Sequence, residues 1–239
     1  MMFLKRSAAA LAAVFLFCSA ASAAPRAYIV AFGLWGDQSV FASEARGAAQ
    51  VARAKFAPAA RVVTAANSKS GGSATASSLA GVLRGFGETM DKERDLIVVI
   101  LTSHGTPAGL AVKAGARRET LSPAALGAML EASGAKQRIV IVSSCYSGVF
   151  ADALADARTL VITAADSRHP SFGCKDGAVW TYFGDAYFNQ ALRRSATMDQ
   201  AFARGRELVG ARERREGFEA SNPQMAGGGG LKLTVPFLR

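Results

Sequence analysis

Two uninterrupted apolar runs constrain the fold of this 239-residue chain more than any other feature. The runs are Leu96–Leu101 and Ile139–Val142, and both are rich in β-branched residues. A strand without polar alternation must be covered on both faces, as in a parallel sheet between two layers of helices. Each run ends abruptly in small polar residues, at Thr102–Gly105 and Ser143–Gly148. The sequence therefore predicts an α/β domain with polar side chains at one edge of its sheet.

Strand-like and helical segments alternate along the rest of the chain. Further strands are expected at Arg26–Phe32, Arg61–Ala65, Leu160–Thr163 and Leu231–Val235. Helices are expected at Val40–Lys55, Ala76–Met90, Pro123–Ala132, Val149–Leu154, Trp180–Arg193 and Met198–Arg215, with a hairpin between Ala111 and Leu121. This order indicates a mostly parallel sheet of about six strands, helices on both faces and right-handed crossovers. The sequence contains no internal repeat and no sign of a second domain.

The first residues have the pattern of a secretory leader. Lys5 and Arg6 precede a short apolar run, and Ala21–Ala23 offers small residues for cleavage. We therefore expect a signal peptide at 1–23, one mature domain at 24–239 and an exported protein, periplasmic or secreted; a permanent membrane anchor is the alternative. No other stretch reaches the roughly 20 apolar residues that span a bilayer, so no stable membrane association is expected after cleavage.

Composition and charge exclude several classes of protein. The chain is 50% hydrophobic and 19% charged with 3 cysteines, which excludes a disordered chain or a small disulfide scaffold. The net charge of +10 would suit a nucleic-acid or anionic-surface binder. However, the arginines between Arg204 and Arg215 are interleaved with Glu207 and Glu213, as on an ordinary solvated helix. We therefore expect no nucleic-acid partner.

A histidine and a cysteine follow the two apolar runs. If those strands are neighbours, His104 and Cys145 project into one crevice at the carboxyl ends of the sheet. A thiol becomes a better nucleophile in suitable surroundings, and an imidazole can protonate a departing amine. Gly105 would let a backbone N–H approach an oxyanion, and a helix beginning near Gly148 would favour the thiolate. The acidic residues before Leu96 lie at the wrong end of the strand to orient the imidazole, so no third catalytic member is evident.

Two other interpretations of these residues remain open. In an oxidising compartment Cys145 could form a disulfide with Cys174. A zinc site built from His104, Cys145, His169 and Cys174 is a further alternative, although the spacing lacks a Cys-x-x-Cys knuckle. The chain has neither a phosphate-binding glycine loop nor a Gly-x-Ser-x-Gly elbow. We therefore expect no metal and no cofactor.

Four motifs in order carry a family resemblance. They are Ser103–Gly105, Ser144–Gly148, Ile162–Asp166 and Thr181–Asp185. Together they resemble the legumain-like (C13) cysteine peptidases of the caspase–haemoglobinase fold, over about Ala27 to Tyr187. The resemblance implies a three-layer, caspase-like fold, and the leader and compact size fit a bacterial exported member.

The resemblance implies roles for the residues at the strand ends. Cys145 would attack the scissile carbonyl to form a thioester, and His104 would protonate the leaving amine. The backbone N–H groups of Gly105 and Cys145 would form the oxyanion hole. The implied activity is cysteine endopeptidase action on peptides or proteins. A peptide ligase or transamidase of the same fold, or an inactive binding module, is the alternative, and nothing indicates an oligomeric state.

The resemblance also implies a pocket for the side chain that precedes the cut. Asp185 matches its acidic residue, Ser171 matches the second of its two serines, and Ser143 stands where a further acidic residue is expected. No Arg-His pair follows the first strand, so Gln38 or Glu44 could supply the missing partner. A pocket with Asp185 as its carboxylate would accept basic side chains as well as asparagine.

Overall fold

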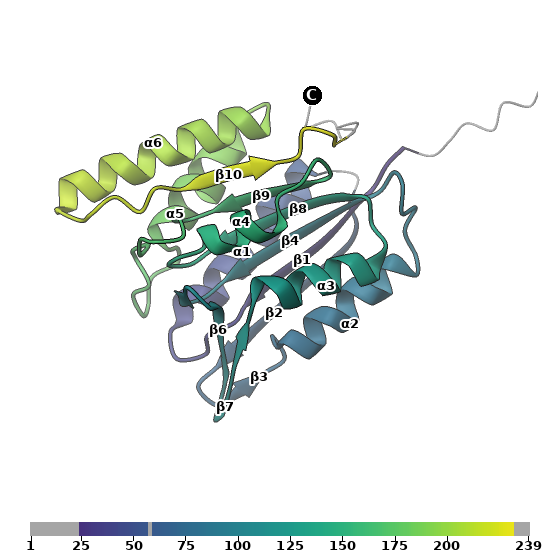
Figure 1. The fold of residues 1–239 in the computed structure, drawn as a ribbon. Helices are drawn as coiled ribbons and strands as arrows, with labels where there is room; N and C mark the ends of the chain where they lie inside the picture. Colours follow the sequence, from purple (N-terminus) through teal and green to yellow (C-terminus); the bar gives the residue numbers. More distant parts are fainter. Residues whose placement is uncertain (1–23, 57–58, 232–239) are drawn as a thin grey trace, which may run out of the picture.

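A seven-stranded sheet runs through the middle of the structure, with the strand order β10-β9-β8-β4-β1-β2-β3 (Figure 1). The computed structural model describes residues 24–56 and 59–231. The five inner strands are parallel: β1 (Ala27–Gly33), β2 (Ala59–Ser68), β4 (Leu96–Thr102), β8 (Gln137–Ser143) and β9 (Thr159–Thr163). The edge strands β3 (Gly71–Gly72) and β10 (Gln224–Gly227) are antiparallel to their neighbours. The predicted mostly parallel sheet is confirmed, with one strand more than expected.

Helices cover both faces of this sheet. One face carries α1 (Ser39–Lys55), the short α5 (Tyr182–Gly184), the π-helix η1 (Asp185–Leu192) and α6 (Met198–Glu216). The other face carries α2 (Ala76–Gly87), α3 (Pro123–Ser133) and α4 (Gly148–Leu154). The predicted three-layer α/β arrangement is therefore confirmed. Among the described residues, no helix combines the length and apolar character needed to cross a membrane.

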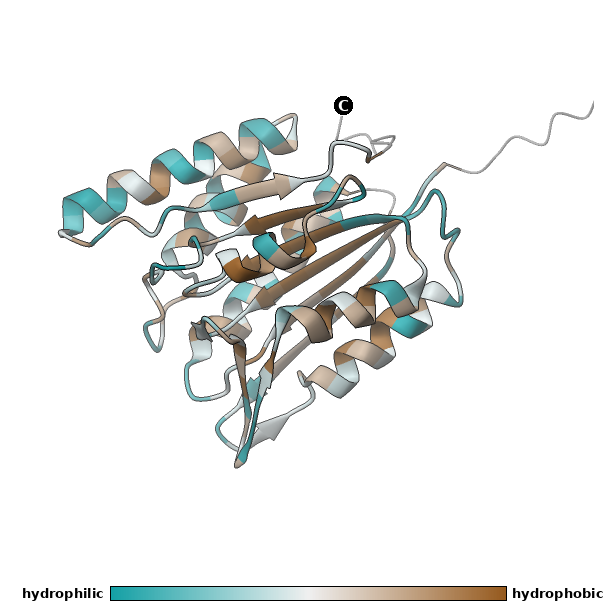
Figure 2. Cartoon of the chain, viewed as in Figure 1, coloured by the Kyte–Doolittle hydropathy of each residue, from teal (hydrophilic) through white to brown (hydrophobic). Residues whose placement is uncertain are grey.

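Strand β4 shows why its sequence has no polar alternation. Val98 and Ile100 belong to the hydrophobic cluster on the α1 side, whereas Val99 and Leu101 belong to the cluster on the α2 side. All seven residues of β4 are buried, and Figure 2 shows the inner strands as the most apolar part of the fold. Burial on both faces therefore explains the continuous apolar run.

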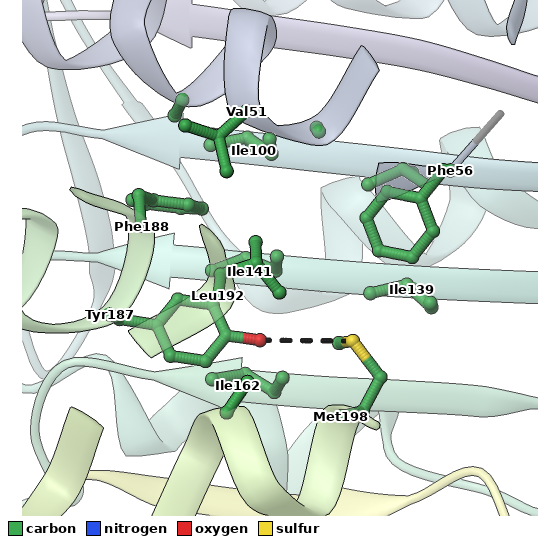
Figure 3. Close-up of a cluster of buried hydrophobic side chains, with 14 of the residues drawn as sticks. Val51, Phe56, Ile100, Ile139, Ile141, Ile162, Tyr187, Phe188, Leu192 and Met198 are labelled. Carbon is green, nitrogen blue, oxygen red and sulfur yellow. Dashed lines mark hydrogen bonds between the residues drawn. The ribbon is translucent and has the colours of Figure 1, made fainter. Parts of the chain in front are cut away.

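The cluster on the α1 side joins strands and helices that are distant in sequence. In Figure 3, Ile100 and Ile141 of the sheet face Val51 of α1 and Phe188 of η1. Phe183, Tyr187 and Phe188 form aromatic pairs with ring centroids 5.3–6.2 Å apart, a spacing typical of buried aromatic packing. These contacts fix η1 against the sheet and so define where the preceding loop must run.

The strand order reverses between β1 and β4. The chain goes from β1 through α1 to β2 on one side, then through α2 back across β1 to β4 on the other. In open α/β sheets such a reversal leaves a crevice at the carboxyl ends of the two strands. The loops after β1 and β4 therefore flank the position where a ligand is expected.

A second, three-stranded sheet follows β4 directly. It contains β5 (Gly105–Thr106), β6 (Gly109–Ala114) and β7 (Arg117–Leu121), and the β6–β7 hairpin confirms the one expected between Ala111 and Leu121. The expected leader at 1–23 lies outside the described residues, as does almost all of the strand expected at Leu231–Val235. The strand that closes this end of the sheet is instead β10, which pairs with β9.

Candidate active site

His104 and Cys145 lie at equivalent points on neighbouring strands. Thr102 of β4 is paired with Ser143 of β8, and each candidate residue comes two positions later. The backbone N–H of Ser103 donates to the carbonyl oxygen of Ser143 at 3.2 Å, so the pairing continues past the strands. Because neighbouring strands are about 4.8 Å apart, the structure brings these two sequence-predicted residues to one edge of the sheet.

Gly105 lets the two strand ends approach each other closely. A Cβ atom at this position would lie 2.2 Å from the carbonyl oxygen of Cys145 and 2.7 Å from the Ser144 hydroxyl oxygen. The histidine side of this contact is held by β6, since the N–H of Ala111 donates to the carbonyl oxygen of His104 at 3.0 Å. The absence of a side chain at Gly105 is therefore a steric requirement of the contact between the two loops.

The Cys145 thiol is held by one residue of a distant loop. The backbone N–H of Ser171 lies 3.3 Å from Sγ, and its carbonyl oxygen accepts from the thiol at the same distance. The N–H of the next residue, Tyr146, donates to the carbonyl oxygen of His169 at 2.9 Å, and Tyr146 has a left-handed φ of 53°. Helix α4 begins at Gly148, as the sequence predicts. Hydrogen bonds at Sγ and at the next residue, Tyr146, therefore fix the position of Cys145.

Aromatic rings surround His104. The rings of Trp35 and Phe41 meet the imidazole edge to face, with centroids 5.3 Å and 5.0 Å away. Burial by these neighbours lowers the pKa of His104 below its usual value, because the charged imidazolium loses hydration. At neutral pH the imidazole is therefore uncharged and able to accept a proton.

Gln38 orients the imidazole, a role that the sequence did not reveal. Its amide nitrogen donates to the carbonyl oxygen of Cys174 at 2.6 Å, so its amide oxygen is the atom that lies 2.5 Å from Nε2 of His104. A carbonyl-type oxygen only accepts, so Nε2 must carry the proton and Nδ1 of the neutral ring must be the proton acceptor. In the sequence, the feature that could have indicated this role is the position of Gln38, which is the last residue before α1 in the loop that follows β1.

The loop that carries Ser171 is also fixed to the start of α1. The Asp176 carboxylate accepts from the backbone N–H of Ser39 at 2.8 Å and from its hydroxyl at 2.9 Å. These hydrogen bonds lower the pKa of Asp176. Together with the contact between Gln38 and Cys174, they join this loop to the β1–α1 junction.

Glu44 forms a buried polar centre beneath the strand ends. Its carboxylate is fully buried and accepts from the Thr102 hydroxyl and the Thr181 backbone N–H, both at 2.8 Å. Ser143 is also buried and belongs to the same network, since its hydroxyl oxygen lies 3.2 Å from that of Thr181. Burial raises the pKa of Glu44, although hydrogen bonds from Ser143, Thr181 and Thr102 oppose the effect. Glu44 thereby joins β4, β8 and α5.

The carboxylate of Asp185 lies on the side of η1 that faces α6. It accepts from the side-chain amides of Asn189 and Gln190 at 2.8 Å and 3.0 Å, and Arg212 of α6 is 3.9 Å away. Of the predicted pocket residues, Ser171 contacts Cys145, and Ser143 lies beneath the site. The Asp185 carboxylate is surrounded by other partners, and the role of Asp185 in a substrate pocket stays a prediction.

The residues of the zinc alternative have other partners. Nδ1 of His169 is 2.7 Å from the Asp166 carboxylate, and its Nε2 is 3.7 Å from Glu219. Across 24–56 and 59–231, no three His, Cys, Asp or Glu side chains form a group that could bind a metal ion.

Cys174 differs from Cys145 in its surroundings. Both are free thiols, so the disulfide considered from the sequence is not present. Burial, followed by the nearby charges of Cys145 and Glu44, raises the pKa of the Cys174 thiol to about 12. Cys174 is therefore protonated at neutral pH and a poor nucleophile, because the thiolate is the reactive form.

Comparison with known proteins identifies the family. The sequence pattern of the peptidase C13 family matches residues 60–227. The solved structure of caspase-1 from Spodoptera frugiperda has a TM-score of 0.60 and covers 90% of this chain and 92% of its own, at 13% sequence identity. This likeness confirms the expected caspase-like fold, whereas no curated protein sequence matches the chain. The family match extends over most of the chain, which therefore belongs to the peptidase C13 family, a membership that implies a cysteine peptidase.

Proposed function

We propose that this protein is a cysteine endopeptidase in which Cys145 is the nucleophile and His104 transfers the proton. One observation carries the proposal: the two residues stand at equivalent positions after the paired strands β4 and β8, and Gln38 orients the imidazole. A nucleophile, a base and a residue that orients the base are the parts that covalent acyl transfer requires. Membership of the C13 family supports the same reaction class.

The first step forms the thioester. Nδ1 of the neutral His104 accepts the thiol proton, while Nε2–H remains bonded to Gln38. Sγ of Cys145 attacks the scissile carbonyl carbon, a C–S bond forms, and the π electron pair moves to the carbonyl oxygen. The N–H groups of Gly105 and Cys145 would stabilise this oxyanion, because preorganised donors act where the charge develops.

Collapse of the tetrahedral intermediate completes the cleavage. The electron pair returns from the oxyanion, the C–N bond breaks, and the His104 imidazolium protonates the departing amine. Water, deprotonated by the same imidazole, then attacks the thioester and releases the acid and the free thiol. An amine that replaced this water would give a new peptide bond, so ligation is a possible outcome of the same intermediate.

The substrate class and location follow from the same proposal. The substrates are peptides or proteins, in agreement with the family. The basic and apolar start of the chain, followed by Ala21–Ala23, supports export and cleavage of 1–23 to a periplasmic or secreted enzyme.

The test is to profile the mature protein against a peptide library while mapping the cysteine that iodoacetamide alkylates. Cys145→Ala should abolish cleavage, and His104→Ala should reduce it by orders of magnitude without unfolding the domain. Cys174→Ala is the matched control, since it removes the second thiol, and it should retain activity. Cleavage by purified Cys145→Ala at the wild-type rate would end the proposal.

A further inference from the structure

Trp35 contacts the imidazole of His104, although it belongs to neither of the two hydrophobic clusters. The two ring centroids are 5.3 Å apart, and the ring planes meet at 81°. Phe41, on the same imidazole at 5.0 Å and 75°, is fully buried, so the core holds its ring. Trp35 is only half-buried, so contacts of another kind must fix its ring.

Two cations of the β6–β7 hairpin lie against the Trp35 ring. Nζ of Lys113 is 5.5 Å from the ring centroid, and the guanidinium carbon of Arg118 is 5.8 Å from it. Lys113 and Arg118 are paired across the hairpin, so their side chains project from the same face. A cation within about 6 Å of an aromatic centroid is attracted to the ring. We call Lys113 and Arg118 the cation clamp.

Backbone hydrogen bonds and an ion pair fix the hairpin to the segment that carries Trp35. The N–H of Lys113 donates to the carbonyl oxygen of Leu34 at 2.8 Å, and the N–H of Gly36 donates to the carbonyl oxygen of Lys113 at 2.9 Å. The Lys113 ammonium also donates to the carboxylate of Asp37 in the same loop. Lys113 is therefore bonded to the chain on both sides of Trp35, which sets the place of the cation clamp relative to the ring.

The contacts of His104 restrict different movements of its ring. The contact between Gln38 and Nε2 fixes one atom of the imidazole, but the ring can still rotate about that contact. The rings of Trp35 and Phe41 both stand nearly perpendicular to the imidazole, so they restrict this rotation. The direction of Nδ1, the proton acceptor on the same ring, therefore depends on Trp35 staying in place.

We propose that Trp35 is a positioning residue for His104 and that the cation clamp acts on the reaction through Trp35. The proposal rests on the proposed function, which assigns the proton transfer to His104. A group that acts only by orienting the imidazole affects the chemical step, so its loss should lower kcat and leave KM nearly unchanged. Misplacing reacting groups by 1 Å can cost about 100-fold in rate, and a more loosely held imidazole should cost part of that factor.

Kinetics of matched variants test this role. We expect Trp35→Leu to lower kcat about 10-fold with less than about a twofold change in KM, and Trp35→Phe, which keeps an aromatic face, to stay within about threefold of the wild type. Arg118→Gln, which removes half of the cation clamp, should lower kcat about threefold. Arg117→Gln is the matched control and should keep the wild-type kcat, because Arg117 is the neighbour of Arg118 on β7 but pairs with Glu119 at 2.9 Å.

The NMR signals of the histidine rings give a readout that does not depend on activity. The chain contains 2 histidines, so the signals of His169 serve as an internal control. An aromatic ring shifts the resonances of protons that lie beside it, so the His104 signals report how the Trp35 ring is placed. At a pH at which both imidazoles are neutral, Arg118→Gln should move the His104 signals and leave those of His169 in place. Arg117→Gln should move neither.

The outcomes separate this role from the peptidase activity. A kcat of Trp35→Leu within twofold of the wild type, an equal loss of kcat in Trp35→Leu and Trp35→Phe, or a change confined to KM refutes the positioning role and leaves the proposed function intact. Unchanged His169 signals show that a variant is folded. If the wild-type protein cleaves no peptide, the proposed function fails and the NMR comparison decides: His104 signals that move in Arg118→Gln but not in Arg117→Gln support the cation clamp, and signals that stay in place refute it.

Discussion

Gly105→Ala tests the close contact between the two strand ends. The added Cβ would lie 2.2 Å from the Cys145 carbonyl oxygen and 2.7 Å from the Ser144 hydroxyl oxygen. Carbon and carbonyl oxygen approach no closer than about 3.3 Å without repulsion, so the two loops must separate by about 1 Å. The backbone of Gly105 is outside the left-handed region, so alanine adds no strain of its own there. The effect of the substitution is therefore steric.

A displacement of this size acts directly on the catalytic geometry. Misplacing reacting groups by 1 Å can cost about 100-fold in rate, which corresponds to roughly 2.7 kcal/mol in the activation barrier. We expect Gly105→Ala to lower kcat/KM by about two orders of magnitude while the domain stays folded. The assay is steady-state cleavage of the best library peptide, with thermal unfolding followed in parallel.

Gly81→Ala is the matched control for this prediction. Gly81 lies within α2, and a Cβ at this position would have nothing within 4 Å. Alanine in an exposed helix stabilises by about 0.5–1 kcal/mol, so this variant should unfold slightly later and keep full activity. A folded Gly105→Ala protein whose kcat/KM stays within threefold of the wild type would refute the reasoning.

Three further predictions concern other parts of the chain. Gln38→Ala should lower kcat by about 5-fold with little change in KM, because one hydrogen bond that orients His104 is worth about 1 kcal/mol; an equal rise in KM would instead indicate a substrate contact. Burial raises the pKa of Glu44, so its contribution to stability is complete below its ordinary pKa of 4.5 and falls as the pH rises through the folded value. Relative to the wild type, Glu44→Gln should therefore gain free energy of unfolding from acid to neutral pH in denaturant titrations, and a constant difference would contradict this. Mass spectrometry of the exported protein should find Ala24 at the N-terminus, whereas an intact Met1 would argue against cleavage.

The inner strands of the fold were predictable from local sequence. A run such as Leu96–Leu101 has few alternatives, because its apolar side chains on both faces need two covering layers. The ends of the runs were predictable for the same reason, since polar side chains such as His104 leave the buried layer. Strand β10 was not predictable in this way, because Gln224–Gly227 has no apolar pattern and gains its hydrogen bonds only from β9.

The partners of the candidate site came from the tertiary structure. Gln38 and Cys174 are separated by 136 positions, and Glu44 and Thr181 by 137, so no spacing in the sequence relates them. The direction of the Asp185 carboxylate was equally hidden, because it depends on how η1 packs against Arg212 of α6.

The sequence by itself determined the layered α/β class, the family motifs and the candidate pair of His104 and Cys145. These features follow from local hydrophobicity and from residues that are contiguous in the chain. Only the tertiary structure decided that Gln38 orients the imidazole, that Glu44 is buried beneath the strand ends and that Phe218 stacks on Phe172. The physical reason is that hydrogen bonds and ring stacking act over about 3–6 Å, and only the folded chain brings such distant residues within that range.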